Sequence, residues 1–253
     1  MNMHSNHYIA FALVLLSVLS CSREKNEKPV YRDPSFDPVL FSDQLPGGLK
    51  NAADPYAKLV YGDILSMLDW SEFSGQLALP DSAEKQVSIT SAESYLWNLN
   101  TGSLLLQIFL SFSKEGDDYV WQEEIRYGIL GTYNEYITVR ENESAKSGSL
   151  QYNMQWFCGL DQLTNPCAPS YRYYEWKITI NGNLAYIVKF ENQTVEPAMN
   201  IEYRLMLAPD GSGSVDAYSG TGRYYHAAWD TLGNGVYTLH NDEIPETHEW
   251  TIP

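Results

Sequence analysis

The chain has 253 residues, of which 44% are apolar, and this length can bury one sizeable core or two small ones. Its 16 Lys and Arg residues stand against 32 Asp and Glu residues, so the net charge is −16 at pH 7. Such a charge repels phosphate backbones and anionic headgroups, which excludes nucleic acid as an expected partner. The 19 Tyr, 7 Trp and 8 Phe residues favour strands, because flat rings pack well on a pleated surface.

Residues 1–20 have the pattern of a signal peptide. Residues 9–19, IAFALVLLSVL, form an apolar run of 11 residues, which is too short for a membrane-spanning helix but has the length of a signal-peptide core. The residues before it include His4 and His7 but no Lys or Arg, so the free amino terminus supplies the positive charge of this region. We therefore expect residues 1–20 to be removed from the mature protein.

The run ends in Val18-Leu19-Ser20-Cys21, which resembles the lipobox of bacterial lipoproteins: aliphatic residues, a small residue and then a cysteine. The resemblance implies cleavage before Cys21, a diacylglycerol on its sulfur and an acyl chain, such as palmitate, on its new amino group. Ser22 stands where the inner-membrane retention signal has Asp, so the resemblance implies an outer-membrane anchor, with periplasmic or surface display left open. The alternative is an ordinary secretory signal followed by a chance cysteine.

The segment after Cys21, SREKNEKPVYRDPSFDP, is charged, contains proline and has no apolar period. This composition predicts a solvated, flexible tether over residues 21–50. A flexible chain of roughly thirty residues spans about 30 Å. The single folded domain, residues 51–253, is thus expected to stand clear of the lipid surface.

Residues 54–69 have the features of an amphipathic helix. Asp54 can cap its first amides and Pro55 suits its first position, while Tyr56, Val60 and Ile64 fall on one face. The polar face lacks the basic residues with which interfacial helices bind membranes. We therefore expect this helix to pack on a sheet.

From about residue 93 the apolar period changes to two, which is typical of antiparallel strands with one buried face. The alternating runs lie at residues 119–129, 150–156, 176–180, 184–190 and 201–207. SLLLQIFLSF, residues 103–112, is almost entirely apolar and is predicted to be covered on both faces. The fold class is therefore mainly β: an antiparallel meander of about ten or eleven strands, curved into a half-barrel or barrel.

Short turns rich in Asn and Gly join these runs, and LAPDGSGSVDAY and WDTLGNGVYTLH look like two copies of one hairpin. The order of elements over residues 50–253 resembles the periplasmic lipoprotein-carrier fold and its lipid-binding lipoprotein relatives. That resemblance implies a curved sheet that holds helices over an apolar concavity. The lipobox, tether, helix and Tyr/Trp-rich sheet also look like a set of Gram-negative envelope lipoproteins, a likeness that implies no activity.

Cys158 and Cys167 bracket a loop sequence between two strands. In an exported protein, two cysteines this close favour a disulfide over a zinc half-site. Free thiols are the alternative.

His240 and His248 lie symmetrically about a turn, with Asp242 nearby. If the hairpin placed the two imidazoles opposite each other, they could share a metal ion. The competing interpretation, solvated histidines at a strand end, is favoured because two ligands do not make a site.

The sequence carries no familiar catalytic motif. Glu123 and Glu124 resemble a carboxylate pair, but neighbours on a strand point to opposite faces and cannot act together. A nucleophile elbow, a phosphate loop and a dinucleotide fingerprint are all missing. We therefore expect no cofactor apart from the lipid on Cys21, and an enzyme is the less favoured class.

These observations favour a lipid-anchored binding module for a hydrophobic ligand or another envelope protein. A surface protein that presents Tyr171, Tyr173, Tyr224 and Tyr225 to glycans or proteins is the first alternative. A hydrolase without a recognisable motif is the second.

Overall fold

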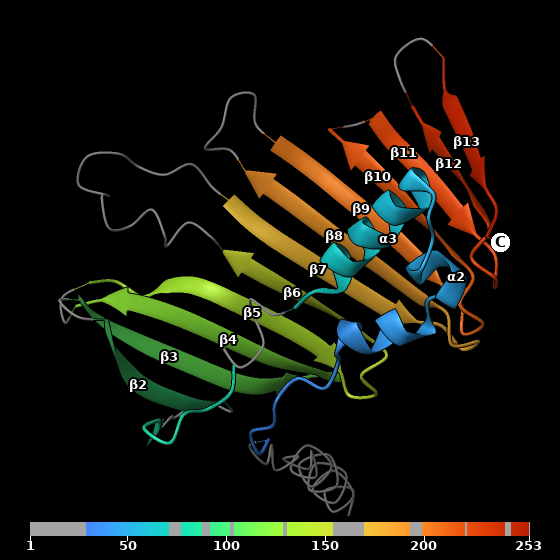
Figure 1. The fold of residues 1–253 in the computed structure, drawn as a ribbon. Helices are drawn as coiled ribbons and strands as arrows, with labels where there is room; N and C mark the ends of the chain where they lie inside the picture. Colours follow the sequence, from blue (N-terminus) through green and yellow to red (C-terminus); the bar gives the residue numbers. More distant parts are fainter. Residues whose placement is uncertain are drawn as a thin grey trace, which may run out of the picture.

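The computed structural model describes residues 29–70, 77–87, 92–101, 104–128, 131–153, 170–192, 199–220, 222–240 and 244–252. The described strands form one antiparallel sheet in which spatial order follows chain order from β1 to β13 (Figure 1). Their bounds are Glu84–Gln86 (β1), Glu93–Thr101 (β2), Leu104–Glu115 (β3), Asp118–Tyr127 (β4), Asn134–Asn142 (β5), Ser147–Asn153 (β6), Ser170–Ile178 (β7), Leu184–Asn192 (β8), Met199–Leu207 (β9), Gly213–Ser219 (β10), Gly222–Trp229 (β11), Gly235–Leu239 (β12) and Glu246–Trp250 (β13).

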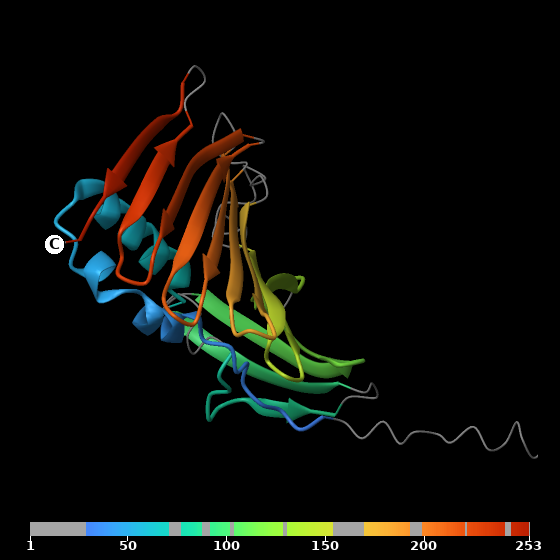
Figure 2. The same ribbon diagram turned by 90° about the vertical axis from the view of Figure 1, so that its right-hand side faces the viewer.

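The prediction of a mainly β meander is confirmed, with thirteen described strands instead of ten or eleven. The difference includes β1, whose three residues are polar and too few to show an alternating pattern. β1 and β13 are the two ends of the strand order, so the sheet is an open half-barrel and the closed-barrel alternative was wrong. Figure 2 shows the curvature of the sheet, with the helices on its inner side. We call this inner side the concave face.

The described helices precede the sheet in the chain. They are the 3₁₀ helix η1 (Pro38–Gln44), the short helix α2 (Gly47–Lys50) and the main helix α3 (Pro55–Leu68). The side chain of Asp54 accepts hydrogen bonds from the amides of Tyr56 and Ala57 at 2.8 and 3.1 Å, so the helix predicted for residues 54–69 is confirmed together with its cap. α3 buries Val60, Ile64 and further apolar residues and lies across the concave face from β12 towards β7 (Figure 1). Among the described residues, no helix combines the length and apolar character that crossing a membrane requires.

Residues 29–37 have no regular secondary structure but pack on the concave face of the strands from β2 to β5, and we call them the strap. Phe36 is 6% exposed and Tyr31 is packed against the core. The folded part therefore begins before residue 51, where the composition had placed the end of a tether. Charge and proline content hid the strap because its few apolar side chains follow no period.

The predicted hairpin repeat is confirmed. Three hairpins share the same two backbone hydrogen bonds. The amide of the first turn residue donates to the carbonyl four positions later, and its carbonyl accepts from the amide three positions later. The residues four positions apart are Thr179 and Asn183, Ala208 and Ser212, and Asp230 and Asn234. The residue three positions along is Gly182, Gly211 or Gly233, with φ of 83°, 88° and 95°. These are the three-residue hairpins that need a residue of positive φ, which glycine adopts without strain.

β3 differs from its prediction. Leu106, Ile108 and Leu110 are buried on the concave face, whereas Leu105 and Phe109, at the alternate positions, are only half-buried. The expectation that both faces are covered was therefore wrong. Phe109 meets the ring of Tyr133 on the outer face, at 5.9 Å between ring centroids, so this face is shielded by neighbouring side chains rather than by a second layer.

Candidate functional site

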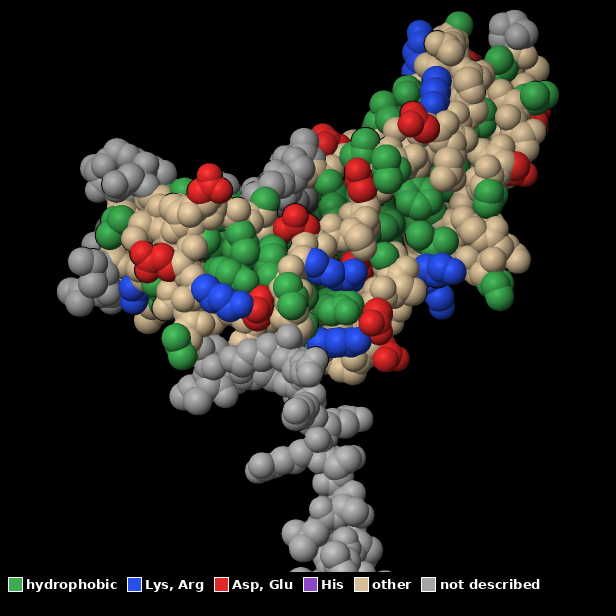
Figure 3. All heavy atoms as spheres, turned by 90° about the horizontal axis from the view of Figure 1, so that it is seen from below, with side chains coloured by type: hydrophobic (Ala, Val, Ile, Leu, Met, Phe, Trp, Pro, Cys, Tyr) green, Lys and Arg blue, Asp and Glu red, His purple; other side chains and the backbone are tan. Residues whose placement is uncertain are grey.

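The part of the concave face formed by β2 to β6 is an apolar surface, which we call the basin. It consists of buried side chains contributed by alternate positions of each strand: Trp97, Leu106, Ile108, Leu110, Phe112, Trp121, Ile125, Ile137, Val139, Leu150 and Tyr152. α3 packs mainly against the other half of the sheet, while the strap contacts the basin. Figure 3 shows hydrophobic side chains gathered in patches on one side of the molecule, with acidic and basic side chains between them.

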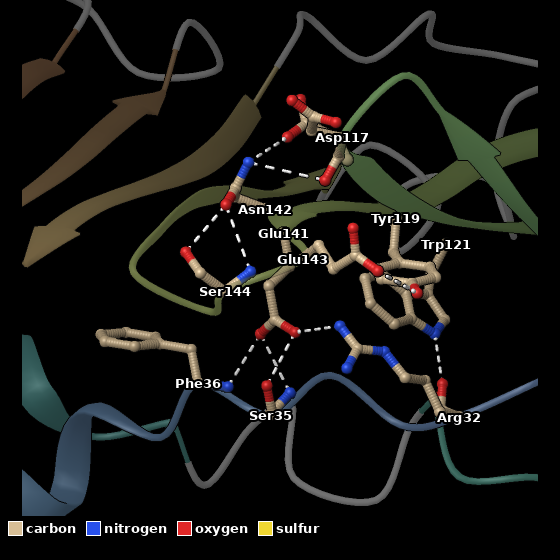
Figure 4. A network of polar contacts seen from close by, with 11 residues as sticks. Arg32, Ser35, Phe36, Asp117, Tyr119, Trp121, Glu141, Asn142, Glu143 and Ser144 are labelled. Atoms are coloured by element: carbon tan, nitrogen blue, oxygen red, sulfur yellow. Dashed lines mark hydrogen bonds and ion pairs between the residues drawn. The ribbon is translucent and has the colours of Figure 1, made fainter.

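Three glutamates are buried in this half of the sheet, and each has a different set of partners. Glu141, on β5, is 0% exposed and anchors the strap (Figure 4). Its carboxylate accepts hydrogen bonds from the amides of Ser35 and Phe36, both at 2.9 Å, and from the Ser35 hydroxyl at 2.8 Å. The guanidinium of Arg32 completes the set at 3.0 Å. The charge of this buried carboxylate is therefore balanced by a cation and by donors of the strap.

The strap is also held at the indole of Trp121, which donates to the carbonyl of Arg32 at 2.7 Å. The guanidinium carbon of Arg32 lies 4.0 Å from the centroid of Tyr119, in cation–π geometry. The ring of Phe36 stacks on Trp176. Polar and aromatic contacts thus fix the strap along the end of the basin nearest β5.

Glu93, on β2, holds the other end of the strap and is 8% exposed. It accepts from the amide of Tyr31 and from the hydroxyl of Tyr95, both at 2.9 Å, and pairs with Lys85. Burial alone would raise the pKa of Glu93, but the hydrogen bonds from Lys85, Tyr95 and Tyr31 lower it below the usual value. Glu93 is therefore a charged strap anchor, like Glu141.

Glu123, on β4, has no such set of partners. It is 1% exposed, and its Oε2 atom has no hydrogen-bond partner. Its neighbours across the sheet are Leu110 and Ile137, which are fully buried. Burial raises the pKa of the Glu123 carboxyl to about 8. The basin therefore contains one carboxyl group in apolar surroundings that no side chain of the described residues neutralises.

The role of Glu123 was missed in the sequence, although a signal was present. In YVWQEEIRYGI, Glu123 occupies the same alternating register as Trp121 and Ile125, so it is the one acidic residue on the apolar face of that strand. Glu124 points to the outer face and is paired across the sheet with Glu135 at a bulge. The prediction that Glu123 and Glu124 cannot act together fits this geometry.

The hypothesis of opposed histidines was wrong. In the pairing of β12 with β13, His248 lies opposite Tyr237. His240 is three residues further along the chain, so the two histidines do not face each other. Trp250 fixes this register, because its indole donates to the carbonyl of Gly233 at 2.6 Å. His248 bonds to Asp54 at 2.9 Å and stacks on Tyr56.

Asp242 lies outside the described residues, as do Cys21, Cys158 and Cys167. The lipid attachment and the disulfide therefore stay predictions. Within the ranges that the structure describes, no group of three or more His, Cys, Asp or Glu side chains is arranged to hold a metal ion.

The four tyrosines expected at the surface lie in different environments. Tyr225 is 1% exposed and its hydroxyl donates to Asp63 at 2.5 Å. The prediction that Tyr225 is exposed at the surface was therefore wrong. A bulge in the pairing of β10 with β11 explains the difference, because it leaves Tyr224 outside the pairing and 52% exposed. Tyr171 and Tyr173 are half-buried on the outer face and bond to Glu191 and Glu175.

Comparisons of the chain with family models, with curated proteins and with solved structures give no match. The site has three parts: an apolar basin, a strap held across it by two buried glutamates, and Glu123, whose Oε2 atom has no hydrogen-bond partner in the part of the chain that the structure describes.

Proposed function

We propose that this protein is a lipid-anchored, non-enzymatic binding protein of the bacterial cell envelope, and that its basin holds a hydrophobic ligand. The observation that carries the proposal is the cover of the basin. Half of the concave face is packed under the regular helix α3, whereas the apolar side chains of β2 to β6 lie against a strap without helix or strand. A cover fixed by a few polar contacts can be displaced at lower cost than a packed helix.

The proposed anchor lies close to the strap in the chain. Only residues 22–28 separate Cys21 from the first strap residue, Pro29. Eight residue steps of at most about 3.6 Å reach about 29 Å. A lipid on Cys21 would therefore hold the basin within about 30 Å of the membrane surface. That distance suits a protein that takes up an apolar ligand from a membrane or delivers it there.

The ligand is tested on the mature protein, extracted from membranes with mild detergent. Native mass spectrometry is expected to show a co-purifying apolar molecule, and the emptied protein is expected to take up Nile red. The variant Leu110→Arg, which places a charge on the basin floor, should lose the dye, whereas Leu65→Arg on the exposed side of α3 should keep it. A folded protein with neither a co-purifying ligand nor dye uptake would overturn the proposal.

The anchor is tested by Cys21→Ser in the full chain. The wild-type chain should incorporate an alkyne-labelled palmitate and sediment with outer membranes, whereas the variant should do neither. Retention of Cys21→Ser in the membrane fraction without label would show that another feature holds the protein there.

A second function is favoured by the outer face of the sheet, where aromatic rings lie beside cations. Lys189 lies 5.7 Å from the centroid of Tyr173, and Arg204 lies 4.6 Å from that of Tyr218. Such amphipathic rings are common at surfaces that recognise glycans or proteins. A glycan array tests this function: binding that Tyr173→Ala and Tyr218→Ala abolish would support it, and an array without binders would remove the glycan version.

A further inference from the structure

We propose that the ligand of the basin is a lipophilic amine, whose ammonium group pairs with Glu123. The inference rests on the proposed function, because it names the chemical class of the ligand. Its starting point is one atom of the Glu123 carboxyl: the side chain is 1% exposed, and Oε2 has no hydrogen-bond partner among the described residues.

A buried polar atom without a hydrogen-bond partner lowers the stability of the folded state, and such atoms are rare in native structures. Leaving such an atom unsatisfied costs about 1–3 kcal/mol, and more when the group is charged. Leu or Ile would fill the same position without this cost, as Leu110 and Ile137 do on the neighbouring strands. A bound molecule that supplies the missing donor gives the carboxyl its use.

The balance of charge in this half of the sheet indicates the sign of the ligand. Glu141 is paired with Arg32, and Glu93 is paired with Lys85. Among the described residues, no cation pairs with Glu123. An ammonium group would donate to Oε2 and be balanced by the Glu123 carboxylate once the carboxyl has released its proton to solvent, whereas a fatty acid would bring an anion that no cation here balances.

The aromatic side chains around this part of the basin favour the same ligand. Tyr31 contacts Phe112 edge-on at 5.4 Å between centroids, and Phe112 lies 5.2 Å from Trp121, the residue two positions before Glu123 on β4. The negative faces of such rings attract ammonium groups. The net charge of −16 also attracts cations to the protein from solution and repels anions.

The ligand would enter the basin where part of the strap is displaced. The ring of Tyr31 lies 5.4 Å from that of Tyr95, which is paired with Leu110, the residue that is in turn paired with Glu123. The hydroxyl of Tyr31 bonds to the carbonyl of Leu77. Displacement of Tyr31 would uncover the aromatic surface beside Glu123 while the contacts of Glu141 hold the strap at its other end.

The test compares decylamine, decanol and decanoate, which share a chain length and differ in head group. Each is titrated by calorimetry into the delipidated mature protein and into the variants Glu123→Gln, Glu123→Leu and Glu124→Gln. Wild type and Glu124→Gln, which changes only the outer face, should bind decylamine at least tenfold more tightly than decanol and should bind decanoate weakest. Both Glu123 variants should lose this preference while their affinity for decanol changes less than twofold.

The outcomes separate the inference from the function on which it rests. Equal affinities for decylamine and decanol in the wild-type protein, or an amine preference that survives Glu123→Gln, would overturn the amine ligand and leave a hydrophobic binding protein. Failure of all three compounds to bind a folded protein would overturn the proposed function itself. Melting curves of each variant, measured alongside, distinguish lost binding from lost folding.

Discussion

The carboxylate of Glu141 accepts the backbone amide of Phe36 at 2.9 Å, which joins β5 to a segment more than one hundred positions earlier in the chain. The same contact positions the ring of Phe36 over Trp176, with 4.3 Å between centroids and 5° between planes. A single buried side chain of the sheet thus determines where the strap lies and which surface it covers.

Glu141→Gln is expected to lower the free energy of unfolding by about 3 kcal/mol or more, since it removes the charge partner of Arg32 and, when its oxygen keeps the strap amides, turns its NH2 donor towards the Arg32 guanidinium. The amides of Ser35 and Phe36 should exchange hydrogen much faster, as measured by mass spectrometry. Glu143→Gln is the matched control, because Glu143 forms an exposed ion pair with Lys114 whose loss should change stability little. Unchanged protection of the strap in Glu141→Gln would contradict the role of Glu141 as its anchor.

The sheet and its main helix were predictable because their residues repeat with a period. Val60 and Ile64 recur with a helical period behind the cap of Asp54, and the strands alternate over long runs. The turns were predictable for a local reason, since Gly182, Gly211 and Gly233 supply the positive φ that the hairpins need.

The strap and its anchors were not predictable, because they depend on contacts between distant residues. Nothing in the sequence around Tyr31 or Phe36 shows that their amides donate to Glu93 and Glu141, which lie on strands far along the chain. A charged segment with two prolines has the composition of a linker whether or not a surface binds it. For Glu123 the sequence showed its place on the apolar face of β4. It did not show that Arg32 and Lys85 pair with the other two buried glutamates, because this depends on the three-dimensional structure.

The stability of the protein is expected to depend on pH through Glu123. Its pKa is raised from 4.5 to about 8 in the folded state, so between these values the folded protein keeps a proton that the unfolded chain releases. Stability from this group is therefore full below pH 4.5 and falls as the pH rises towards 8, by at most about 1.4 kcal/mol per pH unit. Urea unfolding of wild type and Glu123→Leu from pH 5 to 8 measures the difference, which should grow with pH in favour of the variant.

Subtracting the two curves removes the contribution of groups that both proteins share. Glu93 is one of these, because its lowered pKa confines its titration to the acid side of that window. A difference between wild type and Glu123→Leu that stays constant from pH 5 to 8 would show that the carboxyl of Glu123 does not hold a proton in the folded state.

Asp54 joins the start of α3 to the edge of the sheet, since one carboxylate oxygen caps the helix and the other bonds to His248. Asp54→Ala removes both contacts and is expected to cost about 1–2 kcal/mol. Asp54→Asn keeps a capping oxygen and should cost less than half as much, because it loses only the charge opposite His248. Equal losses in thermal unfolding of the two variants would show that the cap contributes little.

Gly213 and Gly62 should respond in opposite directions to the same substitution. A Cβ atom at Gly213 would lie 2.5 Å from the carbonyl oxygen of Met206 and 2.7 Å from the ring of Trp229. The Met206 carbonyl cannot move freely because it belongs to strand backbone. The Trp229 ring cannot move freely because its indole donates to the carbonyl of Gly211. Gly213→Ala is therefore expected to lower the free energy of unfolding by about 1–3 kcal/mol, as overpacking does.

A Cβ atom at Gly62, in the middle of α3, meets nothing within 4 Å. Gly62→Ala should therefore raise the free energy of unfolding by about 0.5–1 kcal/mol, because alanine has less freedom to lose when the helix forms. Urea unfolding of both variants measures the contrast. If Gly213→Ala were as stable as wild type, the site between Met206 and Trp229 would have room for a Cβ atom, and the pairing of Gly213 with Trp229 across β10 and β11 would not require glycine.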